Sequence, residues 1–217
     1  MLGLRFGFAM PMGNFVGEST TTVGGTTTTT PSYPLSDLFS GKIPILIEAG
    51  YEVSSHLVLG LYGSYGFIID KTGDKGCAPG LDCSDRDVEL GIQGVYRFLP
   101  GRPIDPWLGL GIGYEWESFS QKGTLTDTSP PVSYTFSGQD KGPQYLKLQG
   151  GADFVAAQPL GVGPFVSLSF AKYTSITQDN GTFDGMTTQG STTDVPNTAF
   201  HEWFTFGVRG TFRAGGS

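Results

Sequence analysis

Residues 107 to 118 read WLGLGIGYEWES and alternate between two kinds of side chain. Every second residue is large and apolar, namely Leu108, Leu110, Ile112, Tyr114 and Trp116. The residues between them are three glycines and then two acids, namely Gly109, Gly111, Gly113, Glu115 and Glu117. Because successive side chains of a strand point to opposite faces, the stretch predicts a β-strand with one apolar face and one small or acidic face.

The same alternation recurs in seven further segments, and no long segment has the period of a helix. These segments are residues 2–10, 44–53, 57–69, 88–98, 145–156, 164–173 and 203–212. Short and long connections alternate between them, which is typical of an antiparallel meander with turns at one end and long loops at the other. We therefore expect an all-β fold, an eight-stranded antiparallel up-and-down barrel with strand one paired to strand eight.

The chain reads as one domain over residues 1–213, with residues 214–217 as a tail. Long loops are expected at about residues 13–42, 71–86, 120–143 and 174–200. The threonine-rich run at 20–30 has a composition that favours flexibility. The stretch SDLF at 36–39 gives a weak signal for a short capped helical turn.

Composition excludes several classes of protein. Charged residues make up 15% of the chain, below the quarter usual in soluble domains, while glycine accounts for 34 of 217 residues. A net charge of −7 with no basic stripe argues against nucleic-acid binding. No window has 18 consecutive apolar residues, so a membrane helix is not expected. Residues 1–13 lack a signal-peptide pattern, and we expect an exported form to have lost its signal.

Two cysteines, Cys77 and Cys83, are separated by a short stretch that contains proline and glycine. No other cysteine competes for pairing, and no nearby histidine or second cysteine pair suits zinc. We expect a disulfide and hence an oxidising compartment.

The small and polar face suits a confined interior better than a solvent surface. It carries glycine, alanine, serine and threonine together with charges of both signs, which can pair in a narrow lumen. The expected lumen network, with a structural role, is Arg5, Glu48, Glu52, Glu89, Gln93, Arg97, Glu115, Glu117, Lys147, Gln149, Asp153 and Arg209. An eight-stranded barrel leaves room only for such side chains, so a wide water-filled pore is not expected.

The apolar face is nearly free of charge, and its aromatic residues gather near the strand ends. Two such girdles around an aliphatic band match the headgroup levels of a bilayer. The expected girdle residues are Tyr51, Tyr65, Phe67, Tyr96, Phe98, Tyr114, Trp116, Phe154, Phe170 and Phe212. Segments of about 9 to 13 residues are long enough for tilted strands to cross a membrane.

The segments IPILIEAGYEV, PWLGLGIGYEWES and HEWFTFGVRGTF, together with the cysteine loop, resemble the small eight-stranded outer-membrane barrels of Gram-negative bacteria. These are barrels of the OmpA, OmpX and OmpW type, and the chain looks nearest to a group of myxobacterial-type outer-membrane barrel proteins. The resemblance implies a fold and a location rather than a reaction. It also implies insertion by the barrel-assembly machinery, with Phe212 as the aromatic end of the last strand, although Arg213 and the tail follow it.

No catalytic, cofactor or metal site is expected. His56 lies in a short turn, and His201 with Glu202 lacks a convincing serine partner for hydrolysis. The acids of the long connections do not follow a calcium-loop spacing and are interpreted as solvated charge; they are Asp70, Asp74, Asp82, Asp85, Asp179 and Asp184.

Three functional hypotheses remain open. The first is a monomeric, non-enzymatic outer-membrane barrel with periplasmic termini and four extracellular loops, acting in envelope structure, adhesion or surface recognition, with outer-membrane lipid as its surroundings. The second is a narrow channel or transporter for an ion or a small amphiphile. The third is a soluble, lipocalin-like barrel with the apolar face inside.

Overall fold

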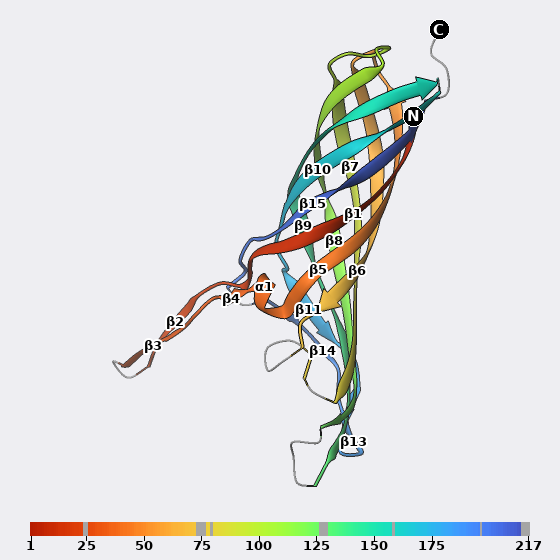
Figure 1. Ribbon diagram of the computed structural model, residues 1–217. Helices are drawn as coiled ribbons and strands as arrows, with labels where there is room; N and C mark the ends of the chain where they lie inside the picture. Colours follow the sequence, from red (N-terminus) through yellow and green to blue (C-terminus); the bar gives the residue numbers. More distant parts are fainter. Residues whose placement is uncertain are drawn as a thin grey trace.

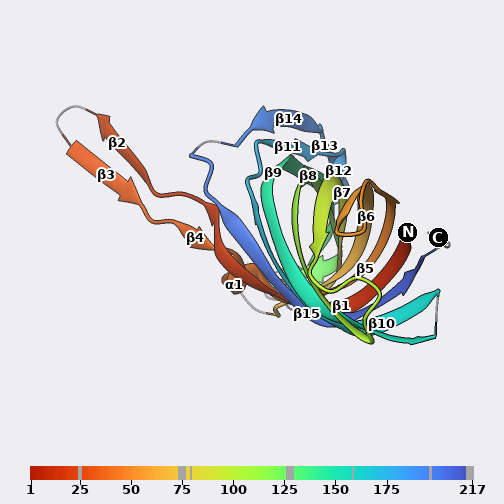
Figure 2. The ribbon, with the colours of Figure 1, turned by 90° about the horizontal axis from the view of Figure 1, so that it is seen from above.

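The computed structural model describes residues 1–217 except 24–25, 73–76, 79, 126–129, 158, 196 and 214–217. Eight long strands form a closed antiparallel barrel in the order β10-β15-β1-β5-β6-β7-β8-β9, with β9 pairing back to β10 (Figures 1 and 2). They are β1 (Leu2–Val16), β5 (Phe39–Glu52), β6 (Leu57–Asp70), β7 (Leu81–Arg97), β8 (Ile104–Leu125), β9 (Val132–Ala157), β10 (Leu160–Ala171) and β15 (His201–Phe212). The predicted fold class is confirmed.

The first and last strands close the wall. β1 pairs with β15 in a continuous register from Leu2 opposite Phe212 to Gly13 opposite His201. Both termini therefore lie at one end of the barrel, together with the short connections at residues 53–56, 98–103 and 158–159 (Figure 1). We call this the turn end, and the opposite end, which carries the long connections, the loop end.

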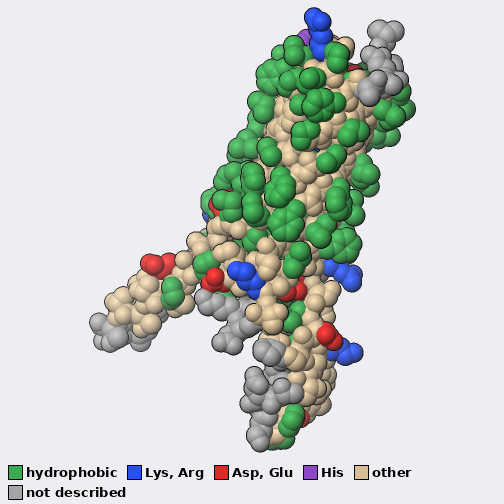
Figure 3. All heavy atoms as spheres, in the orientation of Figure 1, with side chains coloured by type: hydrophobic (Ala, Val, Ile, Leu, Met, Phe, Trp, Pro, Cys, Tyr) green, Lys and Arg blue, Asp and Glu red, His purple; other side chains and the backbone are tan. Residues whose placement is uncertain are grey.

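The distribution of polarity is the reverse of that in a soluble barrel. Leu108, Leu110 and Ile112 of the WLGLGIGYEWES stretch point outward and are more than half exposed, whereas Glu115 and Glu117 are buried inside. Apolar side chains cover the visible face of the barrel towards the turn end, and charged side chains appear mainly near its ends and on the projecting segments (Figure 3). The lipocalin-like alternative, which needs an apolar interior, is contradicted by this arrangement.

At the loop end, strands continue into ranges that were expected to be loops. β8 runs to Leu125 and β9 begins at Val132, and the two strands pair over that whole extension. Beyond the closed wall, β9 pairs instead with β11 (Ser175–Gln178) and β12 (Gly181–Phe183), which pair with β14 (Ser191–Asp194) and β13 (Met186–Thr188). The described parts of the third and fourth long connections thus form a β extension rather than irregular coil (Figure 1).

The first long connection also contains regular structure. β2 (Ser19–Val23) and β3 (Thr26–Thr30) pair as a hairpin that projects sideways from the loop end (Figure 1). β4 (Tyr33–Pro34) pairs with the end of β1, and the helical turn α1 (Leu35–Leu38) follows with Pro34 rather than Ser36 at its N-cap position. Cross-strand pairing therefore orders a run whose composition alone favoured flexibility. No helix in the described ranges is long and apolar enough to span a bilayer.

A β-bulge in β9 changes which side chains enter the lumen. Two residues, Tyr145 and Leu146, lie between Gln144 and Lys147, where the paired β8 has only one residue between Gly111 and Gly113. Gln144 and Lys147 are consequently both buried in the lumen, while Tyr145 points outward. Strict alternation of the sequence does not reveal this shift.

Two small apolar clusters lie at opposite ends of the polar lumen. Towards the loop end, Leu35 of α1 packs with Ala9, Phe39, Ile68 and Trp203. Towards the turn end, buried Val58, Val95, Trp107 and Phe165 pack together. The polar network described next lies between and around these clusters.

Candidate functional site

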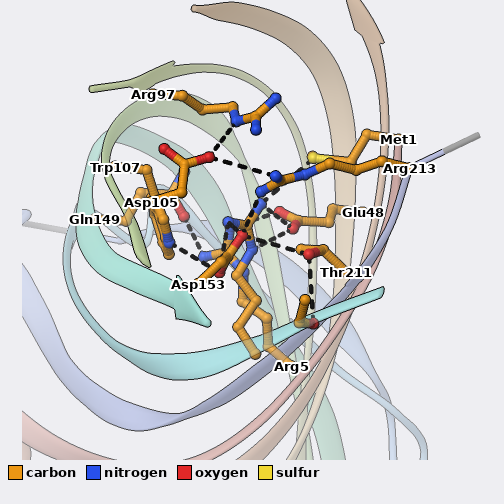
Figure 4. Close-up of polar contacts among 12 residues, drawn as sticks. Met1, Arg5, Glu48, Arg97, Asp105, Trp107, Gln149, Asp153, Thr211 and Arg213 are labelled. Atoms are coloured by element: carbon orange, nitrogen blue, oxygen red, sulfur yellow. Dashed lines mark hydrogen bonds and ion pairs between the residues drawn. The ribbon is translucent and has the colours of Figure 1, made fainter. Parts of the chain in front are cut away.

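Glu48 is the centre of the ionic network near the turn end. Its Oε2 accepts hydrogen bonds from Arg5 Nη2 at 2.5 Å and Gln93 Nε2 at 2.8 Å, and its Oε1 accepts one from Arg209 Nε at 2.7 Å. Arg5 also donates to Gln149, whose amide nitrogen donates in turn to Gln93 at 2.8 Å. These side chains come from five strands, so the network crosses the barrel and ties its walls together (Figure 4).

Two buried aspartates continue the network to the mouth of the turn end. Asp153 accepts hydrogen bonds from Arg213 Nη2 at 2.7 Å and Trp107 Nε1 at 3.2 Å. Asp105 accepts one from Arg97 Nε at 2.7 Å and one from Arg213 Nη1 at 3.3 Å (Figure 4). The residue that follows the expected last strand therefore helps to close the lumen.

Aromatic rings support the buried guanidinium groups. Arg209 lies 4.2 Å from the ring centroid of Trp107, and Arg5 lies 5.0 Å from the same ring. Such contacts stabilise a cation that has lost its water. The Trp107 ring itself lies over Gly151, where a Cβ atom would be 2.9 Å from Trp107 Cζ2.

A second cluster in the middle of the lumen pairs lysines with acids. Lys42 Nζ donates to Asp87 and, at 3.1 Å, to Glu89 Oε1, while Lys147 donates to Glu89 Oε2. Ligand atoms of Asp87, Glu89 and Glu115 lie within 4.8 Å of one another, which is a spacing that a metal ion could use. The Lys42 ammonium already binds two of these carboxylates, so the site is satisfied by the chain itself.

Towards the loop end, a ring stack holds a third cluster. The rings of Tyr173 and His201 are stacked with centroids 4.1 Å apart. His201 Nε2 lies 3.2 Å from Glu115 Oε2, and the Tyr173 hydroxyl donates to Glu117. His201 Nδ1 has no hydrogen-bond partner within the described ranges, so no hydroxyl nucleophile is bonded to this histidine there. The arrangement lacks the parts of a hydrolytic triad.

Glycines of β7 and β8 make room for Tyr62. A Cβ atom on Gly113 would lie 2.6 Å from the Tyr62 hydroxyl oxygen, and one on Gly91 would lie 2.5 Å from Tyr62 Cζ. At Gly111 the corresponding atom would lie 3.2 Å from Tyr62 Cε1. The ring lies flat across these positions, where its hydroxyl donates to Gln144. The bare face of β8 is therefore the space that the Tyr62 side chain of β6 fills, reaching past the intervening strand β7.

The structure places eleven of the twelve expected network residues inside the barrel as buried side chains; these are Arg5, Glu48, Glu89, Gln93, Arg97, Glu115, Glu117, Lys147, Gln149, Asp153 and Arg209. Glu52 differs, because its side chain is one-third exposed at the turn end and lies 3.9 Å from Arg97 Nη1. The expected girdle residues are all exposed or half-exposed, namely Tyr51, Tyr65, Phe67, Tyr96, Phe98, Tyr114, Trp116, Phe154, Phe170 and Phe212. The expected disulfide joins Cys77 to Cys83.

Several lumen residues were not found by pattern. Lys42 and Asp87 lie just outside the segments where alternation was recognised, and Asp105 lies in what read as a turn. His201 is the first residue of β15, whereas Tyr173 and Arg213 lie just beyond the ends of β10 and β15. The signal that could have found these residues is the alternation of inward-facing and outward-facing positions, continued one or two residues beyond each recognised segment.

The structure has a cavity at each end. The one at the turn end has a volume of about 830 Å³ and is lined by Arg97, Arg102, Arg213 and Glu52 among others. The cavity at the loop end, of about 250 Å³, lies between the β extension and the end of the lumen and is lined by Asp70, Asp85, Glu117 and Asp140 as well as by apolar side chains. Asp74, which was expected to be a solvated loop charge, lies outside the described residues.

No family model matches the chain, and no curated protein matches it. Solved structures that match most of the chain include the following three. Neisserial surface protein A has a TM-score of 0.47 and 12% identity, with 96% of this chain and 95% of that chain covered. Ail, the attachment invasion locus protein of Yersinia pestis, has a TM-score of 0.34 and 12% identity, with coverage of 96% and 97%. A major outer membrane protein from Thermus thermophilus has a TM-score of 0.47 and 14% identity, with coverage of 96% and 99%.

Proposed function

We propose that the chain is a non-enzymatic outer-membrane β-barrel protein whose outward apolar face contacts lipid. The observation that carries the proposal is the reversed polarity of the wall. Leu61 and Ile47 are each 63% exposed, whereas Arg5 and Glu48 are each 1% exposed. In water such a surface would promote association, but in a bilayer it is the face that lipid tails solvate.

The backbone of the barrel supports the same proposal. Hydrocarbon offers no hydrogen-bond partners, so a sheet that crosses it must have no open edge. Every strand of the wall has a paired neighbour on both sides, including β1 with β15 and β9 with β10. On this proposal the segments in contact with lipid end, on the loop side, near Ile69 of β6, Val88 of β7, Trp116 of β8 and Pro143 of β9. Beyond these positions, charged residues such as Asp87 and Arg86 lie on both faces of the sheet.

The contents of the lumen favour a surface role over transport. Connected ion pairs occupy the lumen from Asp153 to Lys42. These side chains leave little room for a wide water-filled path for solutes. The hairpin β2–β3 and the β8–β9 extension instead present large polar surfaces at the loop end (Figure 1). We place this end outside the cell, where it acts in recognition or adhesion, and the termini in the periplasm. We expect a monomer that the barrel-assembly machinery inserts.

The first test is detergent dependence. The purified protein should remain folded and monodisperse in detergent micelles and associate when the detergent is removed, as followed by light scattering and circular dichroism. A folded monomer without detergent would refute the membrane assignment. In planar lipid bilayers the inserted protein should give no steady conductance above background, and a stable ionic current would favour the channel alternative.

The second test is orientation. Thr28→Cys lies on the projecting hairpin, and Ser55→Cys lies in an exposed turn at the opposite end. The native cysteines are joined in a disulfide and do not compete for a thiol reagent. In intact Gram-negative cells that export the protein, an impermeant maleimide should label Thr28→Cys and not Ser55→Cys. The reverse labelling would overturn the proposed orientation.

A further inference from the structure

The cavity at the loop end is lined by four carboxyl groups from four successive strands. Asp70 comes from the end of β6, Asp85 from β7, Glu117 from β8 and Asp140 from β9. None of the described residues that line it is a lysine, an arginine or a histidine. In the lumen beneath, by contrast, the single carboxylate of Glu89 forms ion pairs with both Lys42 and Lys147.

The Asp140 carboxyl offers the cavity a buried acceptor that none of the described residues uses. Its residue is 3% exposed, yet its Oδ1 has no hydrogen-bond partner within the described ranges. Oδ1 of Asp85 is likewise buried without a partner there. Buried polar groups without partners are rare in folded proteins, and an oxygen acceptor requires a donor. Both carboxyls line the same cavity, so a single occupant could donate to both.

The remaining wall of the cavity is aromatic and aliphatic. Phe15, Phe39, Phe119 and Phe136 line it together with Ile176. Aromatic faces attract organic cations, and apolar walls accommodate a hydrocarbon body. A bare metal ion fits less well. Among the described residues, the one group with three ligand atoms within 4.8 Å lies lower, at Asp87, Glu89 and Glu115, where Lys42 already binds.

We propose that this cavity binds a small organic cation of the diamine or triamine class, with ammonium groups donating to Asp140 and Asp85 and the aliphatic chain lying against the phenyl rings. An ammonium group donates up to three hydrogen bonds, which suits carboxyls distributed around a cavity. The binding site is a property of the folded loop end, so it goes beyond the proposed surface role and does not depend on which side of the membrane that end faces.

Protonation of the carboxyls that line the cavity gives the proposal a pH dependence. Burial raises the pKa of Asp140 to about 7. Burial, followed by the charge of Asp70 and a hydrogen bond with it, raises the pKa of Asp85 to about 8. Glu117, from the cavity wall, is the other titratable group that faces both carboxyls, and Glu117 in turn faces Asp87 of the lumen beneath. A bound ammonium replaces these protons, so affinity should rise as the pH rises from about 6 to about 8.5.

The test is isothermal titration calorimetry of the full chain in non-ionic detergent at constant ionic strength, with 1,5-diaminopentane as the probe. Wild type should show one saturable site at about pH 8.5. Asp140→Asn and Asp85→Asn should each bind about tenfold or more weakly, because each loses a charge-assisted hydrogen bond. The exposed acid of β14 provides the matched control, and Asp194→Asn should bind as wild type does.

Two comparison ligands separate the proposed chemistry from other binding. Neutral 1,5-pentanediol should not bind, and calcium chloride should neither saturate the site nor displace the diamine. The proposal is overturned if wild type shows no saturable heat, if the diol binds equally well, if calcium competes at lower concentration, or if both substitutions leave affinity unchanged. Circular dichroism checks the fold of each variant, and Asp85→Asn carries the test if Asp140→Asn does not fold.

Discussion

Glu48 offers the most direct test of the idea that the lumen network holds the barrel together. Glu48→Gln keeps the shape of the side chain but removes its charge, which leaves Arg5 and Arg209, each 1% exposed, facing a neutral amide. Removing one partner of a buried ion pair costs about 3–5 kcal/mol. Arg209 retains Asp153 at 3.3 Å, so we expect a loss near the lower limit, about 3 kcal/mol.

The assay is equilibrium urea unfolding in lipid vesicles, followed by tryptophan fluorescence. Glu52→Gln is the control, because its one-third exposed side chain lies 3.9 Å from Arg97 and should contribute about 0–1 kcal/mol. In a double-mutant cycle, Arg5→Met should recover part of the loss in the Glu48→Gln background, with a coupling of about 1 kcal/mol or more. Equal midpoints for the two single glutamine variants would refute the assigned structural role of the network.

Three further outcomes are expected. Gly113→Ala should lower the free energy of unfolding by about 1–3 kcal/mol, because the new Cβ would lie 2.6 Å from the Tyr62 hydroxyl oxygen and 2.5 Å from the Leu90 carbonyl oxygen. Gly94→Ala, whose new Cβ would have its nearest contact at 3.4 Å, should change the free energy far less in the same assay. Leu110→Arg, on the outward face, should cost about 2–4 kcal/mol in vesicles, and a smaller cost would argue against a position near the bilayer midplane. Because burial raises the pKa of Asp85 to about 8, the folded chain retains a proton that the unfolded chain releases, so stability should fall as the pH rises between about 4 and 8. Asp85→Asn should therefore exceed wild type in thermal stability near pH 8.5, and the difference should vanish near pH 3.5; a constant difference would contradict the assignment.

Alternation predicted the wall of the barrel well because it records a physical requirement of the fold. Leu110 faces outward and Glu115 faces the lumen. Because each strand of the wall separates apolar from polar side chains in this way, its sequence shows which face points outward. Gln93 and Arg97 were placed in the lumen on the same grounds, and both are buried there.

The parts that could not be predicted lie where that requirement ends. Past Trp116 the β8–β9 extension no longer separates an apolar face from a polar one, so its pairing left no periodic signal. The bulge at Tyr145 and Leu146 depends on the register between two strands, which one sequence does not reveal. The cavity beside Asp140 is harder still to predict from the sequence, because it is formed by strands that are distant in sequence.

The pairing of β1 with β15 has a consequence for the order of assembly. Leu2 of β1 pairs with Phe212 of β15, so the wall closes only when the first and the last of its strands meet. Until then any partial sheet has two unpaired edges, which hydrocarbon does not tolerate. All eight strands must therefore be present before the wall can close, and a fragment that lacks β15 should keep exposed edges that promote association. Among the described strand pairings of the wall, this one spans the greatest sequence separation, and we expect it to form late in folding.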